Sequence, residues 1–187
     1  MTLEQIKQAC IGEWQSLTPE IRPSALKNSD GTLNPFYLSR QFRYFAGDTF
    51  ELIVTSFADP YGKIALIRMN IRGHMLWQGP HPIADSAQKV DFTADEAYWV
   101  TPLVQGAADN LNQYSKGFDK WEVNQAQNIL GKEFAPFGLK AGQLFKEFDL
   151  VYLYGGMMFW GARNVDGRGF DTEANRPTNL QIPMIRK

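Results

Sequence analysis

Hydrophobic and polar residues alternate with a period of two along much of the chain, a pattern typical of half-buried β-strands. The alternation is clearest in residues 65–74, where apolar and polar side chains would face opposite ways: Ala65, Ile67, Met69 and Ile71 on one face, and Arg68, Asn70, Arg72 and His74 on the other. The same pattern in residues 37–45 and 49–57, on either side of Gly47-Asp48, predicts two strands joined by a tight turn. Further strands are expected at 89–100, 120–129, 148–154, 157–164 and 180–185.

Two segments depart from this pattern and predict helices. Thr2 and Gln5 form a capping-box signature in front of residues 3–10, which carry apolar side chains at helical spacing. Residues 101–115 place Pro102 in a first turn, before a stripe of apolar side chains. Residues 24–36 are polar, and we expect a long loop there.

Seven to nine strands without the spacing of βαβ units predict a mainly β fold in one domain, residues 1–187. A closed or nearly closed antiparallel barrel would remove unpaired sheet edges, and a β-sandwich is the alternative. The length of 187 residues suits a single domain with a sizeable core.

Composition and charge narrow the classes of function. The 19 basic and 20 acidic residues nearly cancel and form no long basic run, so nucleic acid is not an expected partner. No segment is apolar enough for a signal peptide or a membrane span, and the single cysteine, Cys10, cannot form an internal disulfide. These features lead us to expect a cytoplasmic protein.

Two short motifs resemble known families. Gly12-x-Trp14 after a short helix resembles the first signature of lipocalins, members of the calycin group, in which the tryptophan closes one barrel end beneath a packed arginine. A longer resemblance covers nearly the whole chain: "GEW", "EIRP", "SRQFRYFAGDTFE", "IRG" and "ANRPTNLQIPM" are similar to the domain of the adenomatosis polyposis coli down-regulated family, which inhibits Wnt by engaging its lipid. The resemblance implies a lipocalin-like barrel whose apolar interior accepts an acyl chain or a similar apolar molecule. Wnt binding and membrane tethering do not carry over, because this chain has one copy of the domain, one cysteine and no membrane segment.

An internal pocket for a small apolar or amphipathic molecule, such as an acyl chain or a polycyclic compound, is therefore the first functional hypothesis. Its expected lining is apolar and largely aromatic: Met69, Ile71, Trp99, Tyr152, Phe159 and Trp160. Arg40 or Arg43 would hold an anionic end of the ligand, because an inward arginine needs an anionic partner. For any one lining residue ordinary core is the favoured alternative, because apolar lining and apolar core use the same residue types.

Other polar residues favour structural roles. Arg22 is expected to pack on Trp14 or bridge strand ends and His81 to lie in a loop. Arg176 resembles a position of the adenomatosis polyposis coli down-regulated family near the last strand, which implies a structural role.

No hydrolase elbow, phosphate loop, dinucleotide fingerprint or metal-ligand spacing is present, so we expect neither a cofactor nor a metal. A cofactor-free cyclase or isomerase needs no such motif, and Tyr44, His74, Glu96 or Tyr152 could supply its acid or base. A protein-interaction module with a filled barrel, or a homodimer contact through "MMFW", is a further alternative.

Overall fold

The computed structural model describes residues 1–187 and is mainly β, as predicted. The strands are β1 (Gly12–Ser16), β2 (Glu20–Lys27), β3 (Leu33–Phe45), β4 (Thr49–Phe57), β5 (Ala65–Pro80), β6 (Gln88–Pro102), β7 (Gln127–Asn128), β8 (Phe145–Tyr154), β9 (Met157–Trp160) and β10 (Met184–Arg186). The helices are α1 (Leu3–Cys10), α2 (Gln105–Tyr114) and the short 3-10 turns η1 (Ala135–Phe137) and η2 (Glu173–Asn175).

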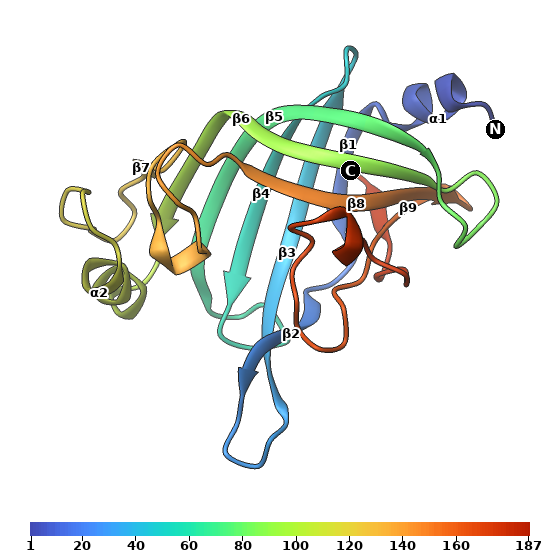
Figure 1. The fold of residues 1–187 in the computed structure, drawn as a ribbon. Helices are drawn as coiled ribbons and strands as arrows, with labels where there is room; N and C mark the ends of the chain where they lie inside the picture. The colour runs from blue at the N-terminus through green and yellow to red at the C-terminus, as the bar shows by residue number, and fades with distance from the viewer.

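All ten strands belong to one antiparallel sheet. Its order is β1-β10-β9-β8-β6-β5-β4-β3-β2, with β7 added beside β6. Strand β1 pairs on both sides, with β10 and with β3. The sheet is strongly curved, so β3, β4 and β5 face β6, β8 and β9 across the interior (Figure 1).

Local sequence explains the long hairpins. In β3, Leu38, Phe42 and Tyr44 are buried and the residues between them are more exposed, as period-two alternation requires. The β3–β4 turn uses Gly47 and Asp48, both with positive φ, which confirms the hairpin predicted there.

Gly73 marks a register shift between β5 and β6. A Cβ atom at this position would lie 1.9 Å from the carbonyl oxygen of Thr93, so only glycine allows the two strands to come this close. The long strands can therefore bend around the interior without losing their pairing.

Several features differ from the prediction: the sheet has ten strands rather than seven to nine, β1 was not predicted, and the last strand covers Met184–Arg186 rather than 180–185. Helix α2 begins at Gln105 rather than at 101, because Thr101 and Pro102 still belong to β6. Residues 24–36 are largely the β2–β3 hairpin rather than a loop. The predicted strand at 120–129 is reduced to the two residues of β7, and the rest of that segment packs Trp121 and Ile129 into the core.

Helix α1 closes one end of the sheet interior. Its capping box between Thr2 and Gln5 is confirmed, and Lys7 pairs with Asp48 of the β3–β4 turn at 2.6 Å. In Figure 1 both chain termini lie near this end of the sheet, away from α2.

Trp14 lies beneath α1, 2% exposed, and its indole nitrogen donates to the carbonyl oxygen of Cys10 at 2.8 Å. The arginine packed on Trp14 is Arg186, whose guanidinium carbon lies 4.4 Å from the ring centre. Arg186 also donates to the carbonyls of Ala9 and Ile11 at the end of α1. The expectation that Arg22 packs on Trp14 is wrong, because Arg22 binds Glu20 instead.

Candidate functional site

The inward side chains of the curved sheet form a surface that we call the inner face. Its members come from six strands: Leu38, Arg40, Phe42 and Tyr44 of β3; Phe50, Leu52 and Val54 of β4; Ile67, Met69 and Ile71 of β5; Phe92 and Tyr98 of β6; Phe145, Glu147 and Asp149 of β8; and Trp160 of β9. Most of them are apolar, so the interior is largely a hydrophobic surface with a few charges embedded in it.

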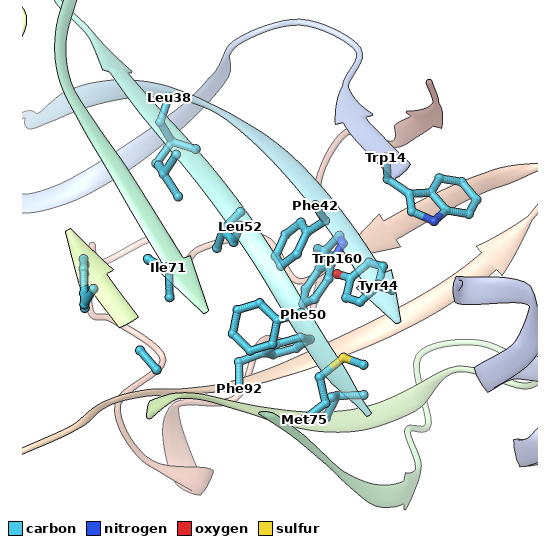
Figure 2. Close-up of a cluster of buried hydrophobic side chains, with 14 of the residues drawn as sticks. Trp14, Leu38, Phe42, Tyr44, Phe50, Leu52, Ile71, Met75, Phe92 and Trp160 are labelled. Carbon is cyan, nitrogen blue, oxygen red and sulfur yellow. The ribbon is translucent and has the colours of Figure 1, made fainter. Parts of the chain in front are cut away.

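Aromatic rings fill the part of the inner face nearest α1. Trp160 stacks on Phe42 with ring centres 4.6 Å apart and contacts Phe92 at 4.5 Å. Tyr44 also stacks on Phe42, with ring centres 5.0 Å apart (Figure 2). These side chains are 5% exposed or less, so this end of the interior is closed.

Exposure increases toward the opposite end of the same strands. Along β3 it rises from Tyr44 at 2% to Leu38 at 8%, and Phe36 beyond them is half-buried. Along β8, Asp149 is buried, whereas Glu147 and Phe145 are half-buried. We call this accessible side, where Phe36 and Phe145 lie, the open end of the inner face.

Between the aromatic group and the open end the interior is narrow. The enclosed space bordered by Phe42, Trp160, Phe145 and Glu147 has a volume of about 10 Å³, which is room for about one water molecule. A molecule larger than water therefore fits between the aromatic group and Glu147 only if side chains shift.

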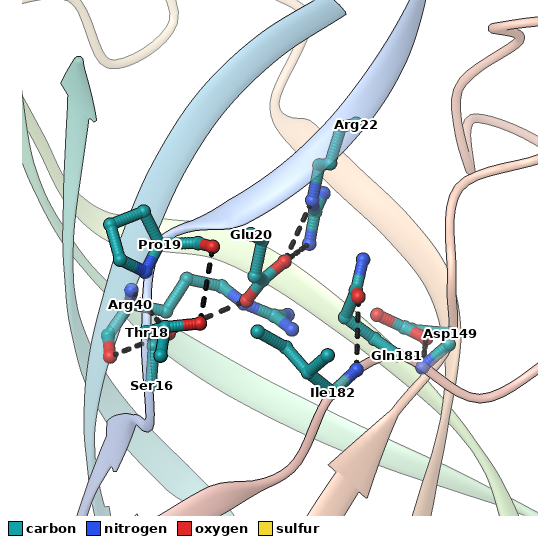
Figure 3. A network of polar contacts seen from close by, with 10 residues as sticks. Ser16, Thr18, Pro19, Glu20, Arg22, Arg40, Asp149, Gln181 and Ile182 are labelled. Atoms are coloured by element: carbon teal, nitrogen blue, oxygen red, sulfur yellow. Dashed lines mark hydrogen bonds and ion pairs between the residues drawn. The ribbon is translucent and has the colours of Figure 1, made fainter. Parts of the chain in front are cut away.

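Charged side chains from β2 and β3 are buried together (Figure 3), and the guanidinium carbon of Arg40 lies 5.2 Å from the ring centre of Trp160 in the aromatic group. Glu20 accepts hydrogen bonds from Nε of Arg22 at 2.8 Å and from Nε of Arg40 at 2.7 Å. Burial alone would raise the pKa of Glu20, but the two guanidiniums outweigh it and hold that pKa below its usual value. One carboxylate thus serves two guanidiniums, and the group of three carries a net positive charge.

Asp149 of β8 is buried in the same interior (Figure 3), near enough to Arg40 for their charges to interact. Its Oδ1 accepts backbone N–H groups from Leu150 at 2.7 Å and Gly161 at 2.9 Å. A Cβ atom at Gly161 would lie 2.5 Å from this oxygen, so glycine is required for the contact. Burial raises the pKa of Asp149 to about 7, although the nearby charge of Arg40 opposes the shift.

Several buried polar atoms of the interior have no hydrogen-bond partner. They belong to both charged and aromatic side chains: Nη2 of Arg22, Nη2 of Arg40, the hydroxyl of Tyr44, Oδ2 of Asp149 and the indole nitrogen of Trp160. Nη2 of Arg22 still lies 2.7 Å from Glu20, outside hydrogen-bond geometry, whereas Nη2 of Arg40 has no hydrogen-bond partner. Unsatisfied buried polar groups are costly and rare, so their concentration here marks the interior as the candidate site.

The raised pKa of Asp149 predicts a pH effect on stability. Between the ordinary aspartate pKa of 3.8 and about 7 the unfolded chain loses this proton while the folded chain keeps it, so the contribution of Asp149 to stability falls as pH rises. Asp149→Asn keeps an oxygen for the two N–H groups and cannot ionise. We expect the variant to gain stability relative to the wild type as pH rises from 4 to 7, with a plateau above, in urea denaturation followed by circular dichroism. A constant difference across this range would contradict the assignment.

The structure separates the residues predicted to bind a ligand. Four of them, Arg40, Met69, Ile71 and Trp160, belong to the inner face. The other four point outward: Arg43, Trp99, Tyr152 and Phe159. The period of two explains the split, because residues an odd number of positions apart in one strand lie on opposite faces.

The outward residues have partners on the outer surface. Arg43 is more than half exposed and lies 3.7 Å from Glu13, and Trp99 is 41% exposed. Tyr152 packs on Phe159 and on Tyr154 outside β8 and β9. Their predicted place in the pocket lining is wrong.

Of the four predicted acid or base residues only Tyr44 points inward, and burial raises its pKa well above its usual value. His74 lies on the outer surface, where its hydrogen bond with Asp95 at 2.9 Å raises its pKa, and Glu96 lies 3.6 Å away. Tyr152 is outward as well. These three do not converge on the inner face.

Arg176 and His81 make structural contacts outside the sheet interior. Arg176 pairs with buried Asp91 at 2.6 Å and also donates to the carbonyl oxygens of Val90 and Asp149. His81 is 8% exposed and accepts the N–H of Ile83. The structural role expected for Arg176 agrees with these contacts, and His81 lies in the predicted loop.

Sequence reasoning missed Glu20, Glu147 and Asp149. Glu20 could have been found, because its spacing of two from Arg22 in a strand places both side chains on the same face. The residues around Asp149 give no sign that its side chain is buried. Its burial depends on the segment after β9, which includes Gly161.

The structure contains no group of three or more histidine, cysteine, aspartate or glutamate side chains arranged to hold a metal ion. Neither helix has the length and apolar character needed to cross a bilayer. No family model matches the chain, and a search of curated proteins found no significant similarity.

Proposed function

We propose that the inner face binds one small amphipathic molecule, with its apolar part at the open end and its polar end toward Arg40. The observation that carries the proposal is the gradient of exposure along β3 and β8, from half-buried Phe36 and Phe145 to buried Arg40 and Asp149. A ligand entering at the open end would meet apolar side chains first and the unpaired guanidinium nitrogen of Arg40 last.

The charge of the interior supports an anionic end. Arg22 and Arg40 share the single carboxylate of Glu20, and Nη2 of Arg40 has no acceptor. An oxyanion beside Arg40 would supply the missing acceptor and balance the excess positive charge.

A lipocalin-like barrel is the architecture that we propose for this function. Pairing of β1 with both β3 and β10 supports it, because every strand in the order β1-β10-β9-β8-β6-β5-β4-β3 then has at least two pairing neighbours. The placement of Arg186 over Trp14 agrees with the lipocalin signature. Membership of the adenomatosis polyposis coli down-regulated family is part of the same proposal and rests on the motif resemblance.

One observation favours a second function, a cofactor-free cyclase or isomerase. Asp149 is a buried carboxyl group with a pKa of about 7, which is suited to general acid–base chemistry near neutral pH. The two functions differ in outcome, because a carrier returns its ligand unchanged and an enzyme alters it.

The proposal predicts binding of amphipathic fluorescent probes. We would titrate 1-anilinonaphthalene-8-sulfonate, which is anionic, and N-phenyl-1-naphthylamine, which has the same ring system without the sulfonate. Arg40→Ala should weaken binding of the sulfonate by about 2–5 kcal/mol, since its partner charge is lost in a buried setting, and should affect the neutral probe far less.

Arg43→Ala is the matched control, because Arg43 lies on the same strand and points outward. It should leave both affinities unchanged. Failure of both probes to bind the folded wild type would overturn the proposed function and would favour an interaction module instead.

A further inference from the structure

We propose that Arg40 and Asp149 together form one subsite for the oxyanion end of the ligand, and that Asp149 takes up a proton from solvent when the oxyanion binds. The inference rests on the proposed function and adds a second recognition residue and a pH dependence to it. The evidence is geometric: both side chains are buried in the same interior, near enough for their charges to interact, and each has one polar atom without a partner.

The hydrogen bonds of Asp149 decide which oxygen carries the proton. Oδ1 already accepts two backbone N–H groups, from Leu150 and Gly161. Oδ2 accepts none, so a proton on Asp149 resides on Oδ2, where it becomes a hydrogen-bond donor. Protonated Asp149 would then offer the ligand a hydrogen-bond donor in addition to the unpaired Nη2 of Arg40.

Electrostatic repulsion couples binding of the oxyanion to protonation of Asp149. An oxyanion beside Arg40 also lies beside Asp149, and two anions in a buried site repel each other strongly. Protonation removes this repulsion and replaces it with a hydrogen bond from Oδ2 to the ligand. Binding and proton uptake must therefore favour each other equally, by thermodynamic linkage.

Other charges around Asp149 set the pH at which this occurs. The charged and titratable groups near it come from several elements: Arg40 and Tyr44 of β3, Arg22 of β2, Glu147 of β8, and Arg176, which donates to the backbone oxygen of Asp149 from the outside. Burial is the largest influence and raises the pKa of Asp149 to about 7. The free site is thus half protonated near neutral pH.

The test is titration of 1-anilinonaphthalene-8-sulfonate at pH 5.5, 7.0 and 8.5, since its sulfonate stays ionised throughout. With a pKa of about 7, only roughly 3% of the free protein is protonated at pH 8.5, so the dissociation constant should rise roughly 10- to 30-fold from pH 5.5 to 8.5. Asp149→Asn should bind at all three pH values as tightly as the wild type does at pH 5.5. N-phenyl-1-naphthylamine should show no such dependence.

A measurement on the wild type alone guards against failure of the variant to fold. Calorimetric titration at pH 7 in two buffers with different ionisation enthalpies should report uptake of roughly half a proton per sulfonate bound. Binding of the sulfonate without proton uptake, or a pH dependence that persists in Asp149→Asn, would overturn this inference and leave the proposed function standing. Absence of binding by either probe would overturn both.

Discussion

Alanine in place of Trp14 is expected to lower the free energy of unfolding by about 3–5 kcal/mol, the usual cost of removing a large buried aromatic side chain. Trp14 is 2% exposed, and its ring separates the end of α1 from the inner face. The substitution also leaves the guanidinium of Arg186 without its stacking partner. Urea denaturation monitored by circular dichroism measures the change.

Trp99→Ala is the control, because Trp99 is 41% exposed on the outer face. It should cost far less than Trp14→Ala. If Trp14→Ala leaves the stability unchanged but abolishes probe binding, then Trp14 is a ligand contact and its structural assignment is wrong.

Glu20→Gln is expected to destabilise the fold by about 3–5 kcal/mol, because it leaves two buried guanidiniums without a counter-charge. Arg22 and Arg40 both bind this carboxylate at 2.7 Å and are about as buried as it is. Since the pKa of Glu20 is held below its ordinary value of 4.5, the wild-type contribution is present above that pH and is lost as pH falls through the folded-state pKa. The difference between variant and wild type should shrink accordingly in acid.

The matched control is Glu13→Gln, which removes a carboxylate from an exposed pair with Arg43 at 3.7 Å. Exposed pairs contribute about 0–1 kcal/mol, so this variant should unfold nearly as the wild type does. Equal effects of the two substitutions would show that the ion pairs of Glu20 do not support the fold.

Period-two alternation predicted the long hairpins well, because one face of each strand packs in the core and the other is exposed to solvent. The same rule could not tell which of Arg40 and Arg43 points inward, because each face of β3 carries one arginine. Only the pairing register of the strand decides between them. Once Phe42 is known to be buried, Arg40 must be as well, and Arg43 must point outward.

Long-range contacts set the features that alternation could not predict. Asp149 contacts the segment that follows β9: it accepts the N–H of Gly161, and its backbone oxygen accepts a hydrogen bond from Arg176. Neither contact can be read from the local pattern of β8. The arginine over Trp14 comes from the last strand, 172 positions later in the chain. Helix α2 starts late because pairing of β6 with β5 continues through Pro102.

The central claim, that a ligand binds inside the sheet, is tested most directly by the indole N–H resonances of the protein's five tryptophans during titration with 1-anilinonaphthalene-8-sulfonate. The indole nitrogen of Trp160 has no partner and lies beside Arg40, whose guanidinium carbon is 5.2 Å from the ring centre. We predict that the Trp160 resonance shifts in proportion to site occupancy, while that of outward Trp99 stays in place. A shift of Trp99 with Trp160 unmoved would place the site on the outer face and contradict the account.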